Sequence, residues 1–446
     1  MSEQANNGCA ADFGVRLIGC TDDVVLPIGM YDYAEALGCC TLVDKTMFIA
    51  DMLDCDASVM VCCRPEGFGK SMNLSMLKAF LERPAVGRAG RSSFVDTLIW
   101  GADGGHYRDE YACYPVISLD FSGVARRGAS VVGVVRDALS GECARLMPLL
   151  EAPDLARDKV RHIERVARGV ASEAEVDSAL GLLIELLEIA CDEQVVLLVD
   201  GYDAAWSRCA SARDASVVGP AELLDRVLFD AIATAGHSLR LTCLMGERPG
   251  PAEEALSSRS CSYCLSTPLS TWCDRWFGFS DAEVEALLNH AGREEYLDEA
   301  REWLEGYRFG RTYCSSPARV IGFLDRGCTA PVRADLYGYA DCLSRVVCDW
   351  NLDRLSALFN LLEAHGCIEV PLCLGAAGPE TSSDDVLWTA LYLSGFLTTD
   401  LIEEPEHGGR LRALRLPNNE LRQAFRLVII DWFERAAEDV RDVDAF

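Results

Sequence analysis

The most informative stretch of the sequence is Ser58-Val-Met-Val-Cys-Cys-Arg-Pro-Glu-Gly-Phe-Gly-Lys-Ser71. Its apolar beginning predicts a buried strand over Ser58–Cys63, and the glycines that follow predict a tight loop. A helical pattern then starts at Lys70 and continues to Leu81. In such a strand–loop–helix junction, exposed backbone N–H groups and the positive end of the helix attract phosphate oxygens. The stretch therefore predicts a phosphate-binding loop.

The side chains of this loop have distinct expected roles. The Lys70 ammonium would reach the β- and γ-phosphates of a nucleotide, and the Ser71 hydroxyl would ligate Mg²⁺. The strict pattern GxxxxGK[ST] is not met, because Arg64 stands where its first glycine belongs. The alternative is a strand–turn–helix junction with an incidental Gly-Lys-Ser. The residues expected to contact the nucleotide are Arg64, Gly67, Phe68, Gly69, Lys70 and Ser71.

Lysine is rare in this chain. Only four of its 41 Lys and Arg residues are lysines, at positions 45, 70, 78 and 159. A compact ammonium fits inside a phosphate-binding loop, whereas a guanidinium is a larger planar fork. The choice of lysine at position 70 therefore favours the phosphate loop over the incidental junction.

A second strand supplies an acidic partner for the loop. The apolar run Gln194–Val199 ends at Asp200, which is the layout that places a carboxylate beside Mg²⁺. The alternative is an aspartate that caps an ordinary loop after a strand. Because the two elements occur in this order with helices between them, we expect Ser71 and Asp200 to share a metal site.

The N-terminal half alternates short β-branched runs with longer helical stretches, which predicts a parallel α/β sheet flanked by helices. We expect a loose tail over 1–25, a P-loop NTPase-like domain over 26–255 and a mostly helical C-terminal domain over 256–446. Ser280 and Glu283 have capping-box spacing at the start of one C-terminal helix. The other expected strands are Val116–Asp120 and Arg240–Met245, and the expected helices are Ser130–Leu150, Glu173–Ala190, Pro220–Ala235, Glu294–Leu304, Leu352–Gly366 and Asn418–Val440.

Charge and composition exclude several classes of partner. The formal net charge is −29, which repels nucleic-acid phosphates, so broad, sequence-independent binding of nucleic acid is not expected. The Arg-rich stretch Asp158–Arg168 could form a local basic patch or simply a solvated face.

No apolar run is long enough for a membrane span, and the N-terminus lacks a signal-peptide layout, so we expect a cytoplasmic protein. The 21 cysteines are expected to be free thiols, including the single CxxC of Cys261 and Cys264.

The order and spacing of these motifs resemble the bacterial AAA-ATPase-like family, whose members often carry a C-terminal PD-(D/E)XK nuclease-like domain. The resemblance covers nearly all of 26–430, and it implies ATP and Mg²⁺ as ligands. The segments that carry it begin with Leu26-Pro27-Ile28-Gly29, Val43-Asp44-Lys45-Thr46, the phosphate loop, Tyr114-Pro115-Val116 and Asp120-Phe121-Ser122. They continue with Asp200 to Asp203, Phe277-Gly278-Phe279-Ser280, Gly306-Tyr307-Arg308-Phe309-Gly310, Ser394-Gly395-Phe396-Leu397-Thr398 and Leu416-Pro417-Asn418-Asn419-Glu420.

The departures from the family concern catalysis. The family loop usually has two arginines where this chain has Glu66 and Gly67, and Gly201 replaces the glutamate expected to polarise the attacking water. Met245 stands where the family tends to show threonine. Asp203 is the remaining candidate for the catalytic base. Hydrolysis is therefore expected to be very slow, and Gly201→Glu is expected to speed it up unless the backbone there needs glycine.

Two functions remain open from the sequence. The first is an ATP-binding protein that hydrolyses ATP weakly or only vestigially. In this protein the C-terminal helices would sense the state of the bound nucleotide. The second is a non-enzymatic interaction module on a degenerate phosphate-loop fold, and the sequence names no protein partner. Nuclease activity is not expected, because no Asp followed by Glu-x-Lys occurs after residue 400, where there is no lysine.

Overall fold

The computed structural model describes residues 14–20, 24–84, 93–125, 130–209, 218–332, 352–375, 384–400 and 411–427, with positions 336 and 343. All structural statements below concern these residues. Most of the expected helix Asn418–Val440, from residue 428 on, lies outside them.

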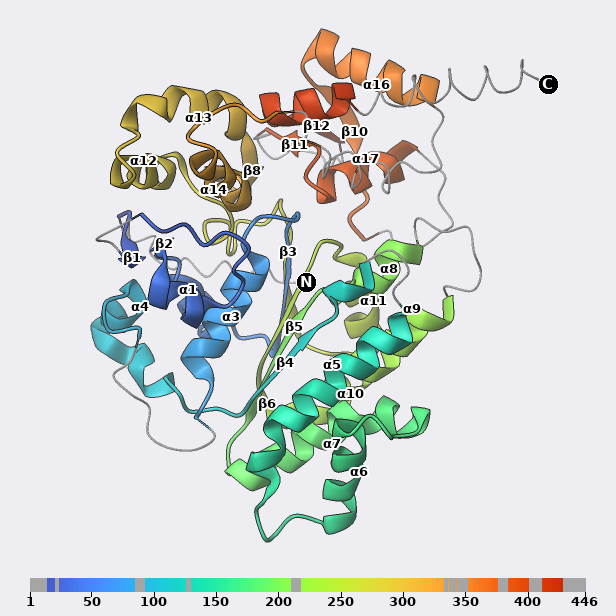
Figure 1. Cartoon of the computed structure of the whole chain (residues 1–446). Helices are drawn as coiled ribbons and strands as arrows, with labels where there is room; N and C mark the ends of the chain where they lie inside the picture. Colours follow the sequence, from blue (N-terminus) through green and yellow to red (C-terminus); the bar gives the residue numbers. More distant parts are fainter. Residues whose placement is uncertain are drawn as a thin grey trace, which may run out of the picture.

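A five-stranded sheet forms the centre of the N-terminal half (Figure 1). Every neighbouring pair of its strands is parallel. The expected α/β class with a parallel sheet flanked by helices is therefore confirmed. In spatial order the strands are β4 (Val116–Asp120), β5 (Val195–Asp200), β6 (Leu239–Gly246), β3 (Val59–Cys63) and β7 (Tyr263–Ser266).

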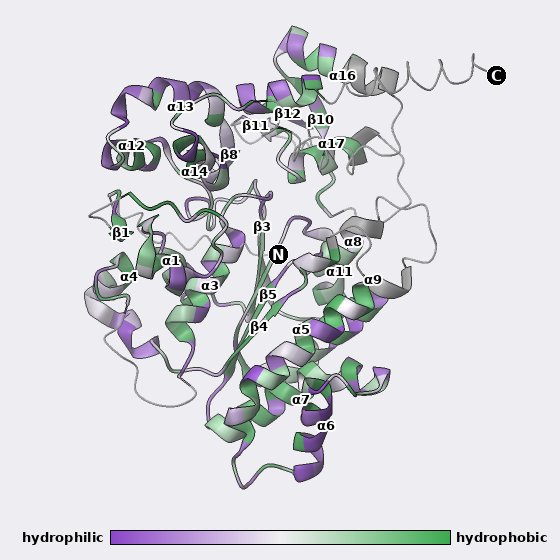
Figure 2. Cartoon of the chain, in the orientation of Figure 1, coloured by the Kyte–Doolittle hydropathy of each residue, from purple (hydrophilic) through white to green (hydrophobic). Residues whose placement is uncertain are grey.

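The central strands are apolar on both faces because helices cover both sides (Figure 2). Met60 and Cys62 of β3 belong to the core on the side of α3 (Lys70–Leu81). Val61 and Cys63 belong to the opposite core, together with α5 (Val131–Leu146) and α7 (Glu173–Cys191). The alternation along one strand therefore anchors the phosphate loop between two separate cores.

The helices around the sheet follow the sequence pattern with local irregularities. The structure has α3 at the expected bounds, whereas the helix expected over Ser130–Leu150 ends in a 3-10 turn at Met147–Leu150. No helix of the described residues is long and apolar enough to cross a membrane. The remaining helices of this half are α1 (Tyr33–Cys39), α2 (Met47–Leu53), α4 (Leu98–Gly101), α6 (Arg157–Ala167), α8 (Ala204–Cys209), α9 (Val218–Leu224), α10 (Ala231–Ala235) and α11 (Gly250–Ser258), with 3-10 segments at Ala102–Glu110, Ser122–Ala125 and Gly236–Ser238.

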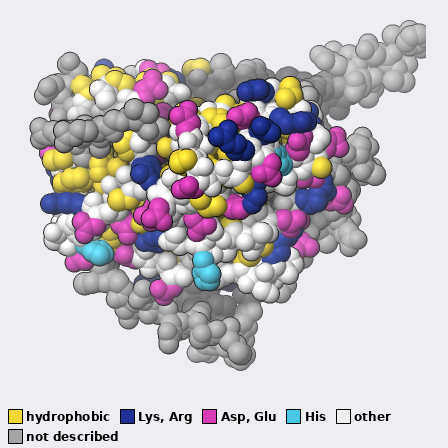
Figure 3. All heavy atoms as spheres, turned by 90° about the horizontal axis from the view of Figure 1, so that it is seen from below, with side chains coloured by type: hydrophobic (Ala, Val, Ile, Leu, Met, Phe, Trp, Pro, Cys, Tyr) yellow, Lys and Arg dark blue, Asp and Glu magenta, His cyan; other side chains and the backbone are white. Residues whose placement is uncertain are grey.

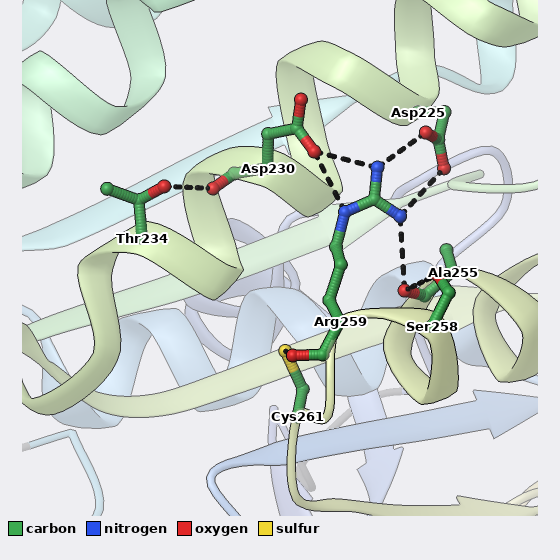
Figure 4. A network of polar contacts seen from close by, with 7 residues as sticks. All are labelled: Asp225, Asp230, Thr234, Ala255, Ser258, Arg259 and Cys261. Atoms are coloured by element: carbon green, nitrogen blue, oxygen red, sulfur yellow. Dashed lines mark hydrogen bonds and ion pairs between the residues drawn. The ribbon is translucent and has the colours of Figure 1, made fainter.

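The helix expected over Pro220–Ala235 contains a π-helical segment at Asp225–Asp230, between α9 and α10. Arg259, just after α11, donates from Nη2 to Asp225 at 2.6 Å and from Nε to Asp230 at 2.8 Å (Figure 4). The third partner of its guanidinium is the Ala255 carbonyl, at 3.1 Å from Nη1. This network ties α11 to the π segment on the flank of the sheet.

Two short strands differ from the sequence-based expectation. β7 belongs to the central sheet, so the sheet continues past the domain boundary expected at residue 255. Within the segment expected to be a loose tail, β1 (Leu17–Gly19) pairs antiparallel with β2 (Thr41–Val43). Residues 1–13 lie outside the described part of the chain.

The C-terminal region combines helices with small sheets. It adjoins the edge of the central sheet at which the phosphate loop lies (Figure 1), and its buried residues Phe277, Phe309 and Leu391 belong to the same core as α3. The capping box of α12 is present, with Ser280 and Glu283 in the expected roles. The elements are α12 (Asp281–His290), a 3-10 turn at Glu294–Tyr296, α13 (Leu297–Leu304), β8 (Tyr307–Phe309), β9 (Thr312–Cys314), α14 (Pro317–Asp325), α16 (Leu352–His365), β10 (Ile368–Pro371), α17 (Asp384–Leu393), β11 (Thr398–Thr399) and β12 (Leu411–Arg415), followed by helical residues 419–427.

Candidate functional site

The candidate site lies at the carboxyl edge of the parallel sheet. β3 leads into the phosphate loop there, β5 ends at Asp200, β6 ends at Gly246 and β4 ends at Asp120. Because β6 lies between β3 and β5, residues that follow β6 stand between the loop and Asp200. This is the edge at which open α/β sheets bind ligands.

The loop backbone is arranged to leave amide groups free. Gly67 and Gly69 have φ values of +84° and +82°, which a residue with a side chain adopts only under strain. No hydrogen bond of ordinary geometry within the described residues uses the N–H groups of Gly69, Lys70 or Ser71. These N–H groups open α3, whose positive dipole end also favours an anion.

Lys70 folds back over the loop that precedes it. Its Nζ donates to the carbonyl oxygens of Arg64 at 2.8 Å and of Pro65 at 2.9 Å. The same Nζ lies 3.9 Å from Oε1 of Glu247, the first residue after β6. Glu247 was not among the residues predicted from the sequence. Its signal was available, because it directly follows a predicted strand that ends at the same sheet edge as Asp200.

Ser71 and Asp200 meet directly. The Ser71 hydroxyl donates a hydrogen bond to Oδ2 of Asp200. Burial raises the pKa of Asp200 and nearby Asp120 adds to that, while the Ser71 hydrogen bond and the Lys70 charge oppose it. A hydroxyl and a carboxylate side by side are hard oxygen ligands of the kind that Mg²⁺ prefers, so the donor set fits this ion. The structure therefore brings Lys70, Ser71 and Asp200 together as the sequence led us to expect.

Arg64 points away from the loop interior. It is fully buried, and its guanidinium donates to the carbonyl oxygens of Cys63 at 2.7 Å and Ser266 at 3.0 Å. Its Cζ lies 4.7 Å from the centroid of the Phe277 ring and 5.1 Å from the centroid of the Phe309 ring. We therefore leave Arg64 out of the proposed phosphate ligands and assign it to the contact between β3 and the C-terminal region.

The C-terminal region holds the outside of the loop. The buried ring of Phe68 packs edge-on against Tyr307 and Phe309, with ring centroids 4.8 Å apart in both pairs. The Gly67 carbonyl accepts hydrogen bonds from the Ser316 hydroxyl at 3.0 Å and from the Ala318 N–H at 3.2 Å. Phe68 and Gly67 thus connect the loop to β8 and to the start of α14, and the backbone of these residues rather than the Phe68 side chain is available to a ligand.

Asp203 is engaged in shaping the site. Only 4% of it is exposed, and its Oδ2 accepts from the backbone N–H groups of Glu247 at 3.1 Å and Arg248 at 2.8 Å. Burial raises its pKa, and the two N–H groups oppose the rise. The Tyr202 hydroxyl donates to the Arg248 carbonyl at 2.5 Å. Asp203 and Tyr202 therefore fix the backbone that follows β6, which leaves Asp203 poorly placed to receive a proton from water.

Gly201 is required by the backbone. Its φ is +66°, and a Cβ built on it would lie 2.7 Å from the Ser122 nitrogen and 2.9 Å from the Ser122 Cα. These are backbone atoms after β4 that cannot swing aside. From the sequence we expected Gly201→Glu to speed hydrolysis only if the backbone at position 201 does not need glycine. The structure shows that it does need glycine.

No second chemical centre competes with this site in the described residues. Their cysteines are free thiols, and no group of three or more His, Cys, Asp or Glu side chains is placed to hold a metal ion. On the face seen in Figure 3, basic and acidic side chains stand side by side. Lys159 and Arg165 of α6 pair with Glu185 and Glu175 at 2.5 Å and 3.1 Å, as on a solvated face.

A hollow of about 370 Å³ lies at the opposite end of the sheet, where β4 begins. Arg145, one of its lining residues, pairs with Glu82 and Glu142. Two of the charged residues that line the hollow, Arg145 and Glu82, are therefore paired with each other, and none of the lining residues belongs to the phosphate loop.

The comparison with known families agrees with this geometry. No curated protein matches the chain. Residues 27–248 match the family model described as "Predicted AAA-ATPase", a stretch that includes the phosphate loop and Asp200. An ATPase family implies nucleotide binding in general. Residues 27–248 thus carry a predicted AAA-ATPase domain according to this family model.

Proposed function

We propose that this chain binds Mg-ATP, hydrolyses it slowly, and transmits the state of the phosphate loop to the C-terminal region. The observation that carries the proposal is the convergence of Lys70, Ser71 and Asp200 at one sheet edge. Lys70 would leave the Arg64 and Pro65 carbonyls to bind the β- and γ-phosphates, beside the free N–H groups of the loop. Ser71 and Asp200 would hold Mg²⁺, which supplies charge neutralisation for the phosphates.

Slow hydrolysis is supported by the charges around Lys70. Glu66 and Glu247 both lie near the loop, whereas Arg64 is turned into the core. The family arginine expected at position 66 is thus replaced by an acid, and the glutamate expected at 201 is replaced by a glycine that the backbone requires. Fewer cations are available to stabilise the charge of the transition state.

Transmission to the C-terminal region is supported by the contacts outside the loop. The Gly67 carbonyl and the Phe68 ring are held by Ser316 and by the two aromatic residues of β8. A carbon on Gly395, in the segment after α17, would meet Pro65 at 2.7 Å. Any movement of loop residues on nucleotide binding must therefore be accommodated by three separate parts of the C-terminal region.

The test is equilibrium binding of a fluorescent ATP analogue with and without Mg²⁺. Lys70→Ala should weaken binding about 10- to 100-fold, since a hydrogen bond to a charged group contributes about 1.5–3 kcal/mol. Ser71→Ala should mainly reduce the dependence on Mg²⁺. Lys78→Ala, in the last turn of α3, is the matched control and should bind normally. Equal binding by all four proteins would contradict the site.

The second candidate function is a non-enzymatic interaction module. It is favoured by the ion pair between Lys70 and Glu247, which gives the phosphate-binding cation a partner within the chain. Absence of any Mg-ATP binding by the wild-type protein would decide for this second function.

A further inference from the structure

Among the described residues, Glu247 is the acidic side chain that forms an ion pair with Lys70. It follows β6, the strand between the phosphate loop and Asp200. Its Oε1 lies 3.9 Å from Nζ of Lys70, the group expected to bind the terminal phosphates. About a third of the Glu247 side chain, 34%, is exposed, so water can reach the carboxylate.

The backbone that carries Glu247 is fixed by its neighbours. Asp203 accepts hydrogen bonds from the N–H groups of Glu247 and Arg248, and Tyr202 binds the Arg248 carbonyl. Gly246 permits this close approach, because a Cβ there would lie 2.5 Å from Oδ1 of Asp203. A carboxylate held by a rigid backbone beside the phosphate lysine is placed as a water-orienting group has to be.

The other acidic groups at this edge are less suitable. Asp203 is buried and occupied by two backbone N–H groups. Oδ1 of Asp120 accepts a hydrogen bond from the Ser122 N–H. Asp120 ends β4, which is separated from β3 by both β5 and β6. Glu66 is exposed on the loop and forms no ion pair with Lys70 among the described contacts. A side chain at position 201 would overlap the backbone of Ser122.

From this geometry we infer that Glu247 is the general base for ATP hydrolysis, taking the place of the carboxylate that Gly201 lacks. The inference rests on the proposed function. A water oxygen forms a bond to the γ-phosphorus, and the bond from that phosphorus to the β–γ bridging oxygen breaks. The water proton passes to Glu247, and the bridging oxygen leaves with its electron pair on ADP. The products are ADP and inorganic phosphate, and Glu247 returns the proton to solvent.

The surroundings of Glu247 suit this role but also limit the rate. Burial raises its pKa and Asp203 and Glu66 add to that, while Lys70 and Arg248 oppose the rise. A carboxylate with a raised pKa accepts a proton more readily than an ordinary one. Because the same carboxylate attracts Lys70 in the absence of nucleotide, it also competes with the phosphates for that cation.

The test compares wild type, Glu247→Gln and Glu254→Gln as full-length proteins. Glu254, an exposed residue of α11, is the matched control. Each protein is measured for binding of a fluorescent ATP analogue with Mg²⁺, and for single-turnover release of phosphate from ATP. Glu247→Gln should bind as tightly as wild type or a few-fold more tightly, and should lose about 10²- to 10⁴-fold in hydrolysis. Glu254→Gln should match wild type in both.

Three outcomes would overturn the inference. Tighter binding with hydrolysis within about twofold of wild type would show that Glu247 only competes for Lys70. Wild-type protein that binds Mg-ATP without measurable single turnover would remove the reaction but leave the binding site. Wild-type protein that binds no nucleotide would remove the proposed function itself. Thermal unfolding of each variant shows whether a loss of hydrolysis comes from the missing Glu247 carboxylate or from loss of the folded structure.

Discussion

At the scale of the residue, the backbone around position 201 decides what a substitution can do. A side chain there has to adopt a φ of +66° and overlap the backbone of Ser122. We predict that Gly201→Ala lowers the free energy of unfolding by about 2–4 kcal/mol, because strain at positive φ and overpacking both contribute. Gly201→Glu should be at least as destabilising and should not speed hydrolysis. Urea unfolding measures the first effect, and phosphate release the second.

The matched control for position 201 is Gly169→Ala. Gly169 has a nearly identical φ of +68°, but nothing lies within 4 Å of the Cβ that alanine would add. Its cost should be about 1 kcal/mol, the contribution of positive φ alone. Equal losses at the two positions would show that the Ser122 contact is relieved at no cost, and would reopen Gly201→Glu as a route to faster turnover.

Charge at position 66 should tune nucleotide affinity. Glu66 is exposed on the phosphate loop, so an arginine can be accommodated there, whereas a side chain at Gly67 would meet Ser316. We predict that Glu66→Arg tightens Mg-ATP binding about two- to tenfold, since exposed charge interactions are worth about 0.2–1 kcal/mol each. The gain in Mg-ATP affinity should become smaller as the salt concentration rises, because salt screens exposed charges. An affinity that is unchanged at low salt would place the phosphates away from residue 66.

At the scale of the element, the sequence predicted the strands that are long and apolar. β4 and α3 have the expected bounds, and β5 and β6 differ by a residue at each end. β7 was missed because it has four residues, of which three are only partly buried at the sheet edge. Short edge strands carry little hydrophobic pattern, so only their pairing reveals them.

The site was partly predictable for a related reason. Lys70, Ser71 and Asp200 converge because parallel strands end at one edge, which follows from the order of the elements. The direction of the Arg64 side chain was not predictable, because its partners Ser266 and Phe309 lie about two hundred or more residues further along the chain. The positive φ of Gly201 likewise depends on the packing of β4 beside β5.

We infer that Arg259 stabilises the π segment at Asp225–Asp230. In a π-helix residues five apart lie about one turn apart, so Asp225 and Asp230 can face the same guanidinium (Figure 4). In an α-helix of 3.6 residues per turn they would point to different sides. We predict that Arg259→Lys, which loses the fork of donors, lowers the free energy of unfolding by about 1 kcal/mol. It should also speed hydrogen exchange of the π-segment amides.

Arg226→Lys is the control for this prediction. Arg226 lies in the same segment but forms one exposed pair with Asp177, at 3.5 Å. Such pairs contribute about 0–1 kcal/mol, so exchange of the π segment should not change. If Arg259→Lys left hydrogen exchange unchanged as well, the π geometry would have to come from the packing of Val227, Leu228 and Phe229 instead.

At the scale of the whole molecule, the core on the α3 side runs without interruption into the C-terminal region. The phosphate loop lies at that junction, so we expect a rearrangement of the loop to affect the C-terminal region. Coupling between two sites is reciprocal in free energy. If C-terminal contacts organise the loop for nucleotide, then nucleotide must stabilise those contacts by the same amount.

The Ser316 hydroxyl offers the sharpest test of this coupling, because it reaches the loop through a single hydrogen bond to the Gly67 carbonyl. We predict that Mg-ATP slows hydrogen exchange in β8 and at the start of α14. Ser316→Ala should weaken Mg-ATP binding about three- to tenfold, since a hydrogen bond contributes about 0.5–1.5 kcal/mol. It should also reduce the slowing of exchange in β8, because the loop and the C-terminal region are then less firmly joined.

Thr329→Ala is the matched control, since its hydroxyl also donates to a backbone carbonyl, that of Arg326 at 3.1 Å, but away from the loop. It should leave both Mg-ATP affinity and the nucleotide-dependent exchange unchanged. Exchange in β8 and α14 that is the same with and without Mg-ATP, in a wild-type protein shown to bind it, would contradict the coupling. The contacts of Phe68 and Gly67 would then act only in holding the loop in place, and the nucleotide state would have to be sensed elsewhere on the sheet edge.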